Sequence, residues 1–258
     1  MLHIGTSGWQ YRHWRETFYP RKLAQRAWLE YYAERFHTAE VNSTFYNLPP
    51  ASVFEQWAAR TPSDFVFALK MSRFLTHLRR LRNPEQPVEL FLERARELGA
   101  KRGPTLLQLP PSLKADAGLL DAALAAFPPG ERIAVELRHP SWFVPDVRSV
   151  LERRGAPLCL ADRGGIRSPE WATAGWGYVR FHMGRAHPPS CYGPAALETW
   201  AERIARVWPG PADVFVYFNN DAFACAIRDA IVMARICAGH GLNTTRVPPA
   251  GDVALGAA

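Results

Sequence analysis

One short stretch decides the fold: R-I-A-V-E-L-R at residues 132–138. Its β-branched and apolar residues predict a strand, in which successive side chains point to opposite faces. Val135 and Leu137 share one face, whereas Glu136 and Arg138 share the other. Helices cover both faces of an open parallel sheet, so its strands are apolar on both sides. A face that turns polar toward the carboxyl end of the strand therefore favours a closed barrel, whose lumen opens on a polar rim.

The same alternation recurs along the chain, separated by longer amphipathic segments typical of βα units. We expect eight strands, at residues 2–6, 38–42, 65–70, 105–109, 132–138, 157–162, 177–182 and 213–219. Helices are expected at residues 24–36, 52–60, 88–98, 117–127, 147–154, 195–207 and 221–238, and none is expected over 163–176. The alternative architecture is an open doubly wound sheet. Eight repeats without a Pro/Gly/Ser-rich linker predict an α/β protein with a single (β/α)8 TIM-type barrel domain over residues 1–258.

The composition is that of a soluble globular protein. The chain has 258 residues, of which 48% are hydrophobic and 21% charged, and this excludes a disordered or collagen-like chain. The formal charge of +7 permits an anionic partner without requiring one. Only four residues are lysines, so most of the positive charge is arginine scattered along the chain.

The cysteines and the termini give little functional information. Cys159, Cys191, Cys225 and Cys237 form no C-x-x-C motif, and we expect buried, reduced thiols. The amino terminus shows no secretory pattern, and the apolar segment 222–238 is interrupted by charged residues. The sequence therefore predicts a cytoplasmic protein without a membrane partner, and it does not indicate an oligomeric state.

Polar residues on the lumen-facing side of the expected strands form the candidate site, because barrel active sites lie at the carboxyl ends of strands. These residues are Glu40, Asn42, Lys70, Gln108, Glu136, Arg138, Asp162, Arg180, His182, Tyr217 and Asn219. Burying charges of both signs is costly unless they pair or bind a ligand. We favour a functional site over a structural ion network.

Four of these residues have expected catalytic roles. Glu40 and Glu136 form a general acid/base pair, or alternatively neutralise neighbouring cations. His182 moves a proton near neutral pH, and Asp162 orients it. The same four residues are the ligand set of a second hypothesis, a metal-dependent phosphodiesterase. The set offers only three carboxylates and one imidazole, and the chain has no H-E-x-x-H motif, so we expect no tightly bound metal.

The remaining candidates are expected to bind the ligand. Lys70, Arg138 and Arg180 would hold an anion, although Lys70 is also a candidate Schiff-base lysine or the partner of a nearby carboxylate. The other candidates are Asn42, Tyr46, Gln108, Trp142, Tyr217, Asn219 and Asn220. The basic stretch at residues 72–82 either grips a phosphate backbone or is a solvated amphipathic turn.

Several motifs together resemble the YecE-like family of bacterial proteins, domain of unknown function 72. They are G-T-S-G-W at 5–9, E-V-N-S-T-F-Y at 40–46, Q-L-P-P at 108–111, E-L-R-H at 136–139 with S-W at 141–142, R-F-H at 180–182 and Y-F-N-N-D at 217–221. The resemblance covers nearly the whole chain and implies a single TIM-type barrel of unsettled activity. That barrel has been likened to endonuclease IV-type phosphodiesterases, but this sequence lacks the histidines of a multi-zinc site. Met183 replaces the glycine that usually follows the R-x-H motif.

These observations lead to one main functional hypothesis and two alternatives. The main hypothesis is an enzyme, of hydrolase or lyase type, that uses acid–base chemistry on a small anionic or phosphate-bearing ligand at the barrel mouth. The alternatives are a metal-dependent phosphodiesterase acting on nucleic acid and a non-catalytic nucleic-acid-binding protein. A closed polar cavity favours the first, and an open arginine-lined groove favours the other two. The chain lacks a dinucleotide-binding fingerprint, and no cofactor is identified.

Overall fold

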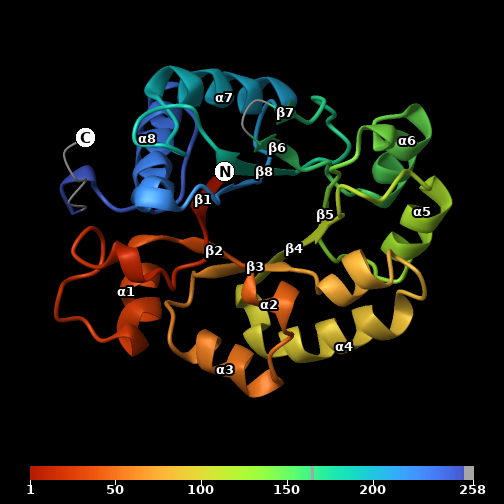
Figure 1. The fold of residues 1–258 in the computed structure, drawn as a ribbon, viewed down its shortest axis with the longest axis horizontal. Coiled ribbons are helices and arrows are strands. Elements are labelled where there is room, and N and C mark those ends of the chain that lie inside the picture. The colour runs from red at the N-terminus through yellow and green to blue at the C-terminus, as the bar shows by residue number, and fades with distance from the viewer. Residues whose placement is uncertain (164–165, 253–258) are drawn as a thin grey trace.

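The computed structural model describes residues 1–163 and 166–252, with most helices arranged around a central ring of strands (Figure 1). The strands are β1 (Leu2–Ser7), β2 (Thr38–Val41), β3 (Val66–Lys70), β4 (Arg102–Gln108), β5 (Ile133–Glu136), β6 (Leu160–Arg163), β7 (Ile166–Arg167), β8 (Gly177–Met183) and β9 (Val214–Phe218). The α-helices are α1 (Trp28–Arg35), α2 (Ser43–Tyr46), α3 (Ala51–Ala59), α4 (Glu85–Ala95), α5 (Ala117–Ala125), α6 (Pro145–Arg154), α7 (Pro194–Val207) and α8 (Cys225–Gly239).

Eight parallel strands form the barrel. The sheet runs in the order β5-β4-β3-β2-β1-β9-β8-β6, and the short β7 pairs antiparallel with β6 at its end. Two backbone hydrogen bonds join the two ends of this sheet, from Val135 N to Pro157 O at 3.0 Å and from Cys159 N to Val135 O at 2.8 Å. The predicted (β/α)8 barrel is confirmed, and the open-sheet alternative is wrong.

The barrel lumen has its own small core beneath the mouth. Its buried members are Ala68, Leu106, Ala134, Cys159, Ala161, Tyr178, Phe215 and Tyr217. A larger hydrophobic cluster fills the layer between the strands and the surrounding helices. Along β3, β4, β5, β8 and β9, alternate residues face these two cores, which is the parity that the sequence pattern predicts.

The helices follow from apolar faces and local capping. In α7 the buried residues Leu197, Trp200, Ala201 and Ile204 recur at helical spacing, so one face packs on the barrel. Helix α6 starts with Pro145 at its first turn and ends at Gly155, whose φ of 60° is the left-handed conformation that favours glycine. The predicted helices agree with the structure within a few residues, but the short helix α2 was not expected.

The cysteine prediction is half wrong. Cys191 and Cys225 form a disulfide that joins the loop after β8 to the start of α8. Cys159 and Cys237 are buried free thiols, as expected. The two bridged cysteines are separated by 34 residues, and no local motif marks them as partners. Within the described residues, no helix combines the length and apolar character needed to cross a membrane.

The close approach of β1 and β2 generates a stability prediction. A Cβ atom added at Gly5 would lie 2.2 Å from the backbone oxygen of Thr38, which is far inside contact distance. We expect Gly5→Ala to lower the free energy of unfolding by about 3 kcal/mol, because the rigid backbone of β2 has to move. Gly175→Ala is the matched control, since nothing lies within 4 Å of its added Cβ. Urea denaturation measures both, and equal stability of the two variants would contradict this packing.

Candidate functional site

A buried arginine links three strands at the top of the lumen. Arg180 on β8 is 1% exposed, and both of its acidic partners are fully buried. Its Nη2 donates to Glu40 Oε1 at 2.7 Å and its Nε donates to Glu40 Oε2 at 2.9 Å. Its Nη1 donates to Glu136 Oε2 at 2.5 Å. The guanidinium therefore spans the barrel between β2 and β5, with a bidentate contact on one side.

Other donors complete the coordination of both carboxylates. Glu40 accepts hydrogen bonds from Ser7 Oγ and Tyr178 OH, both at 2.7 Å. Glu136 accepts from Gln108 Nε2 at 2.9 Å and from Arg138 Nε at 2.8 Å. All four carboxylate oxygens thus accept hydrogen bonds from fixed groups.

The same contacts keep both carboxylates charged. Burial alone would raise the pKa of Glu40, but the Arg180 charge and the hydrogen bonds outweigh burial and hold this pKa below its ordinary value. For Glu136, burial is likewise outweighed, by Arg180 and then His182, and the pKa lies well below its ordinary value. Such carboxylates accept a proton poorly. The geometry favours the alternative role, in which Glu40 and Glu136 neutralise cations.

A cavity of about 520 Å³ opens above this ion network. Its lining residues are Tyr11, Asn42, Phe45, Tyr46, Lys70, Arg73, His77, Gln108, Arg138, Arg180, His182 and Asn219. Four of these described lining residues are Lys or Arg, and none is Asp or Glu. The mouth of the barrel is therefore a cationic cavity of small-molecule size.

Lys70 is the most unusual cation in this cavity. It ends β3 and is 7% exposed, and among the described residues no carboxylate oxygen lies within 4.0 Å of its Nζ. Its Nζ lies 4.2 Å from the centroid of the Phe45 ring. Burial, followed by the positive charge of Arg180, lowers the pKa of Lys70 to about 8. The side chain can therefore lose its proton near neutral pH.

His182 lies beside the ion network and faces the cavity. Its Nε2 is 3.4 Å from Glu136 Oε1 and 3.2 Å from Arg180 Nη1, and its Nδ1 is 3.2 Å from Asn219 Nδ2. Burial, followed by the charge of Arg180, lowers its pKa, so the imidazole is neutral at pH 7. Asn42 Nδ2 in turn donates to Asn219 Oδ1 at 3.4 Å. The structure thus brings these three predicted residues together.

The predicted lumen position of Asp162 is wrong. On β6 this residue is in register with Phe181, whose side chain packs in the layer between strands and helices. Asp162 Oδ2 accepts a hydrogen bond from Trp200 Nε1 on α7 at 3.0 Å. The lumen-facing residues of this strand region are Cys159 and Ala161. Asp162 therefore cannot orient His182.

Three predicted ligand-binding residues also do not line the cavity. Trp142 is fully buried and donates from Nε1 to Leu113 O at 2.7 Å, so it seals the loop after β5. Tyr217 lies in the lumen core, with its hydroxyl 2.7 Å from Thr38 Oγ1. Asn220 donates from Nδ2 to Asp229 Oδ2 at 2.7 Å and to Ser190 O at 2.9 Å. Each of these side chains has a structural partner instead.

Four cavity residues were not among the predicted site residues. Tyr11 and Phe45 lie in the segments that follow β1 and β2, and Arg73 and His77 belong to the basic stretch at residues 72–82. A π-helical turn at Phe74–Leu78 carries that stretch directly from β3 into the mouth. Burial, followed by the charges of Lys70 and Arg138, lowers the pKa of His77 to about 4. The sequence feature that could have identified these four residues is their position in the loops that follow barrel strands.

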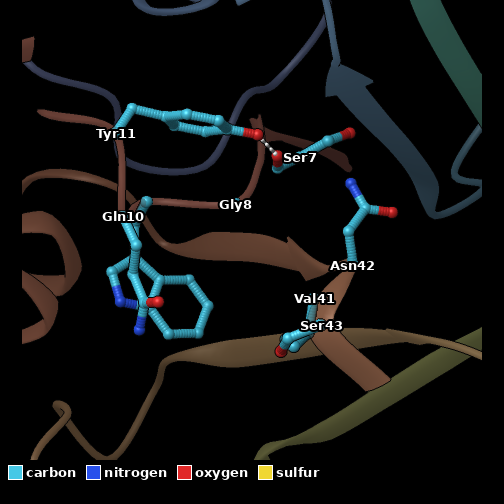
Figure 2. Close-up of a pocket in the computed structure, with 8 residues that line it drawn as sticks. Ser7, Gly8, Gln10, Tyr11, Val41, Asn42 and Ser43 are labelled. Carbon is cyan, nitrogen blue, oxygen red and sulfur yellow. Dashed lines mark hydrogen bonds between the residues drawn. The ribbon is translucent and has the colours of Figure 1, made fainter. Parts of the chain in front are cut away.

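A smaller cavity of about 170 Å³ adjoins the first (Figure 2). Tyr11 and Asn42 belong to the walls of both cavities. The Tyr11 hydroxyl donates to Ser7 O at 2.6 Å, which fixes the ring across one side of the smaller cavity. Asn42 Oδ1 is buried without a hydrogen-bond partner in the described part of the protein. No charged side chain lies among the lining residues of this side cavity.

The ligand set of the metal-dependent hypothesis is not assembled. Glu40 and Glu136 are saturated by fixed donors, and Asp162 faces the helix layer. Across residues 1–163 and 166–252, no group of three or more His, Cys, Asp or Glu side chains is arranged to hold a metal ion. The donor geometry therefore contradicts this particular ligand set.

The ion network generates a stability prediction with a defined pH dependence. Arg180→Met leaves Glu40 buried without its guanidinium, and we expect a loss of about 3–5 kcal/mol in the free energy of unfolding at pH 7.5. In the wild type the lowered pKa of Glu40 gives stability that is retained above about pH 4.5 and lost below it. In the variant, burial dominates and raises that pKa, so stability increases as the pH falls from 7.5 to 5.5.

Urea denaturation at the two pH values measures both effects. Arg148→Met is the control, because Arg148 forms an exposed ion pair with Glu152 that is worth about 0.5 kcal/mol. An Arg180→Met protein as stable as this control, or one whose stability does not change between the two pH values, would refute the role given to Arg180.

The chain is similar in sequence to the proteins of one family. The chain matches the family described as "Protein of unknown function DUF72" over residues 3–251. It is 34% identical to the UPF0759 protein YecE of Escherichia coli K12 over 149 residues, which is 55% of this chain and only half of YecE. It is 26% identical to the UPF0759 protein YunF of Bacillus subtilis, over 86% of this chain and 89% of YunF.

A solved structure supports the architecture independently. The crystal structure of a DUF72 family protein from Thermotoga maritima superposes with a TM-score of 0.80 and 26% sequence identity. The superposition covers 92% of this chain and 99% of that protein. The barrel and its connections are therefore shared along almost the full length of both chains.

Proposed function

The chain belongs to the DUF72 family, whose description assigns no activity, and we propose that it is an enzyme acting on a small anionic or phosphate-bearing ligand in the barrel mouth. One observation carries this proposal: the 520 Å³ cavity is lined by four cationic side chains and, within the described residues, by no carboxylate. Arg180 and Arg138 pair with the carboxylates below the cavity, whereas Lys70 is buried without such a partner among the described residues, and burying its charge is costly unless an anion binds beside it.

The ion network explains why the cavity stays cationic. Glu40 and Glu136 lie beneath the cavity floor, and their oxygens are occupied by Arg180 and by neutral or cationic donors. Arg138 uses Nε for Glu136, and its two Nη groups make no hydrogen bond to the described protein. A guanidinium presents paired N–H donors that match a phosphate or a carboxylate. Arg138 is therefore the best-placed anchor for the anion.

The dimensions of the two cavities define the kind of ligand. A volume of about 520 Å³ suits a metabolite-sized molecule. The adjoining 170 Å³ cavity has Ser, Gln, Tyr and Asn residues and no charged residue in its lining, which favours a neutral polar part of the ligand. A molecule with one anionic end and one neutral polar end fits this combination better than a continuous nucleic-acid strand.

Two residues that face the cavity are suited to acid–base chemistry. Lys70 has a pKa of about 8, and His182 is neutral at pH 7. A group whose pKa lies near the working pH exchanges protons most effectively. In this proposal Arg73 and Arg138 hold the anion, Arg180 adds positive charge while it stays bound to Glu40 and Glu136, and Lys70 and His182 transfer protons.

Anion binding provides the direct test. We expect isothermal titration calorimetry to detect binding of inorganic phosphate and of glycerol 3-phosphate, and Arg138→Gln to weaken it at least tenfold. The expected loss corresponds to one charged hydrogen-bonding contact of about 1.5–3 kcal/mol. Arg132→Gln is the matched control, because Arg132 pairs with Asp213 outside this cavity.

Two results would count against the proposal. The first is equal phosphate affinity of the wild type and Arg138→Gln. The second is the absence of small-anion binding together with salt-dependent binding of a single-stranded oligonucleotide, which would support the nucleic-acid alternative.

A further inference from the structure

We propose that the Lys70 amine is a nucleophile that forms an imine with a small aldehyde or ketone carrying a carboxylate or phosphate group. The inference rests on the proposed function, since the cationic cavity has to hold the anionic end of that molecule. It goes further by naming the reacting atom, Lys70 Nζ, and the chemical class of the substrate.

Lys70 has no carboxylate partner among the described residues. Lys70 is 7% exposed and lines the 520 Å³ cavity. Glu40 and Glu136, the carboxylates whose charges reach it most strongly, are both committed to Arg180. Among the described residues no carboxylate lies within 4.0 Å of Lys70 Nζ. A buried ammonium without such a partner is destabilised relative to the neutral amine.

The neighbours of Lys70 Nζ are an aromatic ring and two arginines. The Phe45 ring excludes water from one side of Lys70 Nζ, 4.2 Å from its centroid, and this cation–π contact favours the ammonium, whereas burial and the charges of Arg180 and Arg138 favour the neutral amine. A lysine that is desolvated and placed beside other cations is activated as a nucleophile, because only the neutral amine has a reactive lone pair. With a pKa of about 8, about a quarter of the amine is neutral at pH 7.5, against about 0.1% for an ordinary lysine.

The cavity around Lys70 can support the formation of an imine. The lone pair of Nζ attacks the carbonyl carbon, the carbonyl π electrons move to oxygen, and a proton passes from nitrogen to that oxygen to give a carbinolamine. The hydroxyl then takes a proton from solvent, the C–O bond breaks to release water, and the nitrogen lone pair completes the C=N bond of a protonated imine, which gives its N–H proton back to solvent to form the neutral imine. The reaction needs no oxidant and no reductant. His77 and His182 line the same cavity as neutral imidazoles that can relay these protons.

The anionic end of the substrate has its own binding groups. Arg138 and Arg180 belong to the same cavity wall as Lys70. If Lys70 served only as a third anion-binding cation, it would pair with the ligand as an ammonium and would not form a covalent bond. Chemical trapping distinguishes these two roles.

The experiment uses reductive trapping on the full chain. Pyruvate or pyridoxal 5′-phosphate is mixed with the protein at pH 7.5, sodium cyanoborohydride reduces any imine to a stable secondary amine, and peptide mass spectrometry locates the adduct. The chain has only four lysines, and exposed Lys22 and Lys114 serve as internal controls. We expect labelling of Lys70 at least tenfold faster than that of either control, with a rate that rises around pH 8.

Variants and a competitor make the result specific. Lys70→Arg keeps a positive charge but has no reactive amine, and its label should be lost from this position. Lys114→Arg should leave the labelling of Lys70 unchanged. Inorganic phosphate should slow labelling at Lys70 without affecting Lys22, because it competes for the cationic cavity.

The outcomes separate this inference from the proposed function. Phosphate binding by calorimetry, combined with equal or absent labelling of Lys70, would overturn the imine proposal and leave the anion-binding enzyme intact. Absence of both phosphate binding and Lys70 labelling would overturn both. Fast Lys70 labelling that phosphate suppresses supports both.

Discussion

The buried ion network of Arg180, Glu40 and Glu136 is the constraint on which the rest of the site depends. Two carboxylates and one guanidinium at the top of the lumen would destabilise the barrel if any of them lacked partners. They are tolerated because every carboxylate oxygen accepts fixed hydrogen bonds and the guanidinium spans β2, β5 and β8. The network therefore stabilises the barrel mouth and at the same time removes both acids from the chemistry of the cavity above it.

This use of the acids determines the electrostatics of the site. With Glu40 and Glu136 committed beneath the floor, the cavity surface is left with cations and neutral polar groups. In our proposal an anionic ligand binds to these cations, and Lys70, which has no carboxylate partner among the described residues, is the reactive group. Glu40 and Glu136, which look like a general acid/base pair in the sequence, both pair with Arg180 in the structure and hold its guanidinium in place.

The barrel and much of the mouth could be predicted from the sequence, because both follow from a local pattern. The alternation in the stretch 132–138 and its counterparts places Glu136, Arg138, Arg180 and His182 on the lumen side, and the structure agrees. Asp162 was misplaced because the register of β6 depends on its neighbour β8, and its partner Trp200 lies on a distant helix. The partners of Trp142 and Asn220, and the disulfide between Cys191 and Cys225, are likewise tertiary contacts without a local signal. The pairing of both acids with Arg180 rather than with Lys70 could not be read from residue types alone.

Because Glu40 and Glu136 pair with Arg180, Lys70 is buried without a carboxylate partner in the described part of the chain. A pH titration by NMR of the protein labelled with ¹³C at the lysine ε carbons tests it most directly, because the four lysines give four resolvable signals and Lys70→Arg assigns one of them. We expect the Lys70 signal to titrate near pH 8, since burial and then the Arg180 charge lower its pKa. Titration of all four signals near the ordinary lysine value of about 10.4 would contradict it.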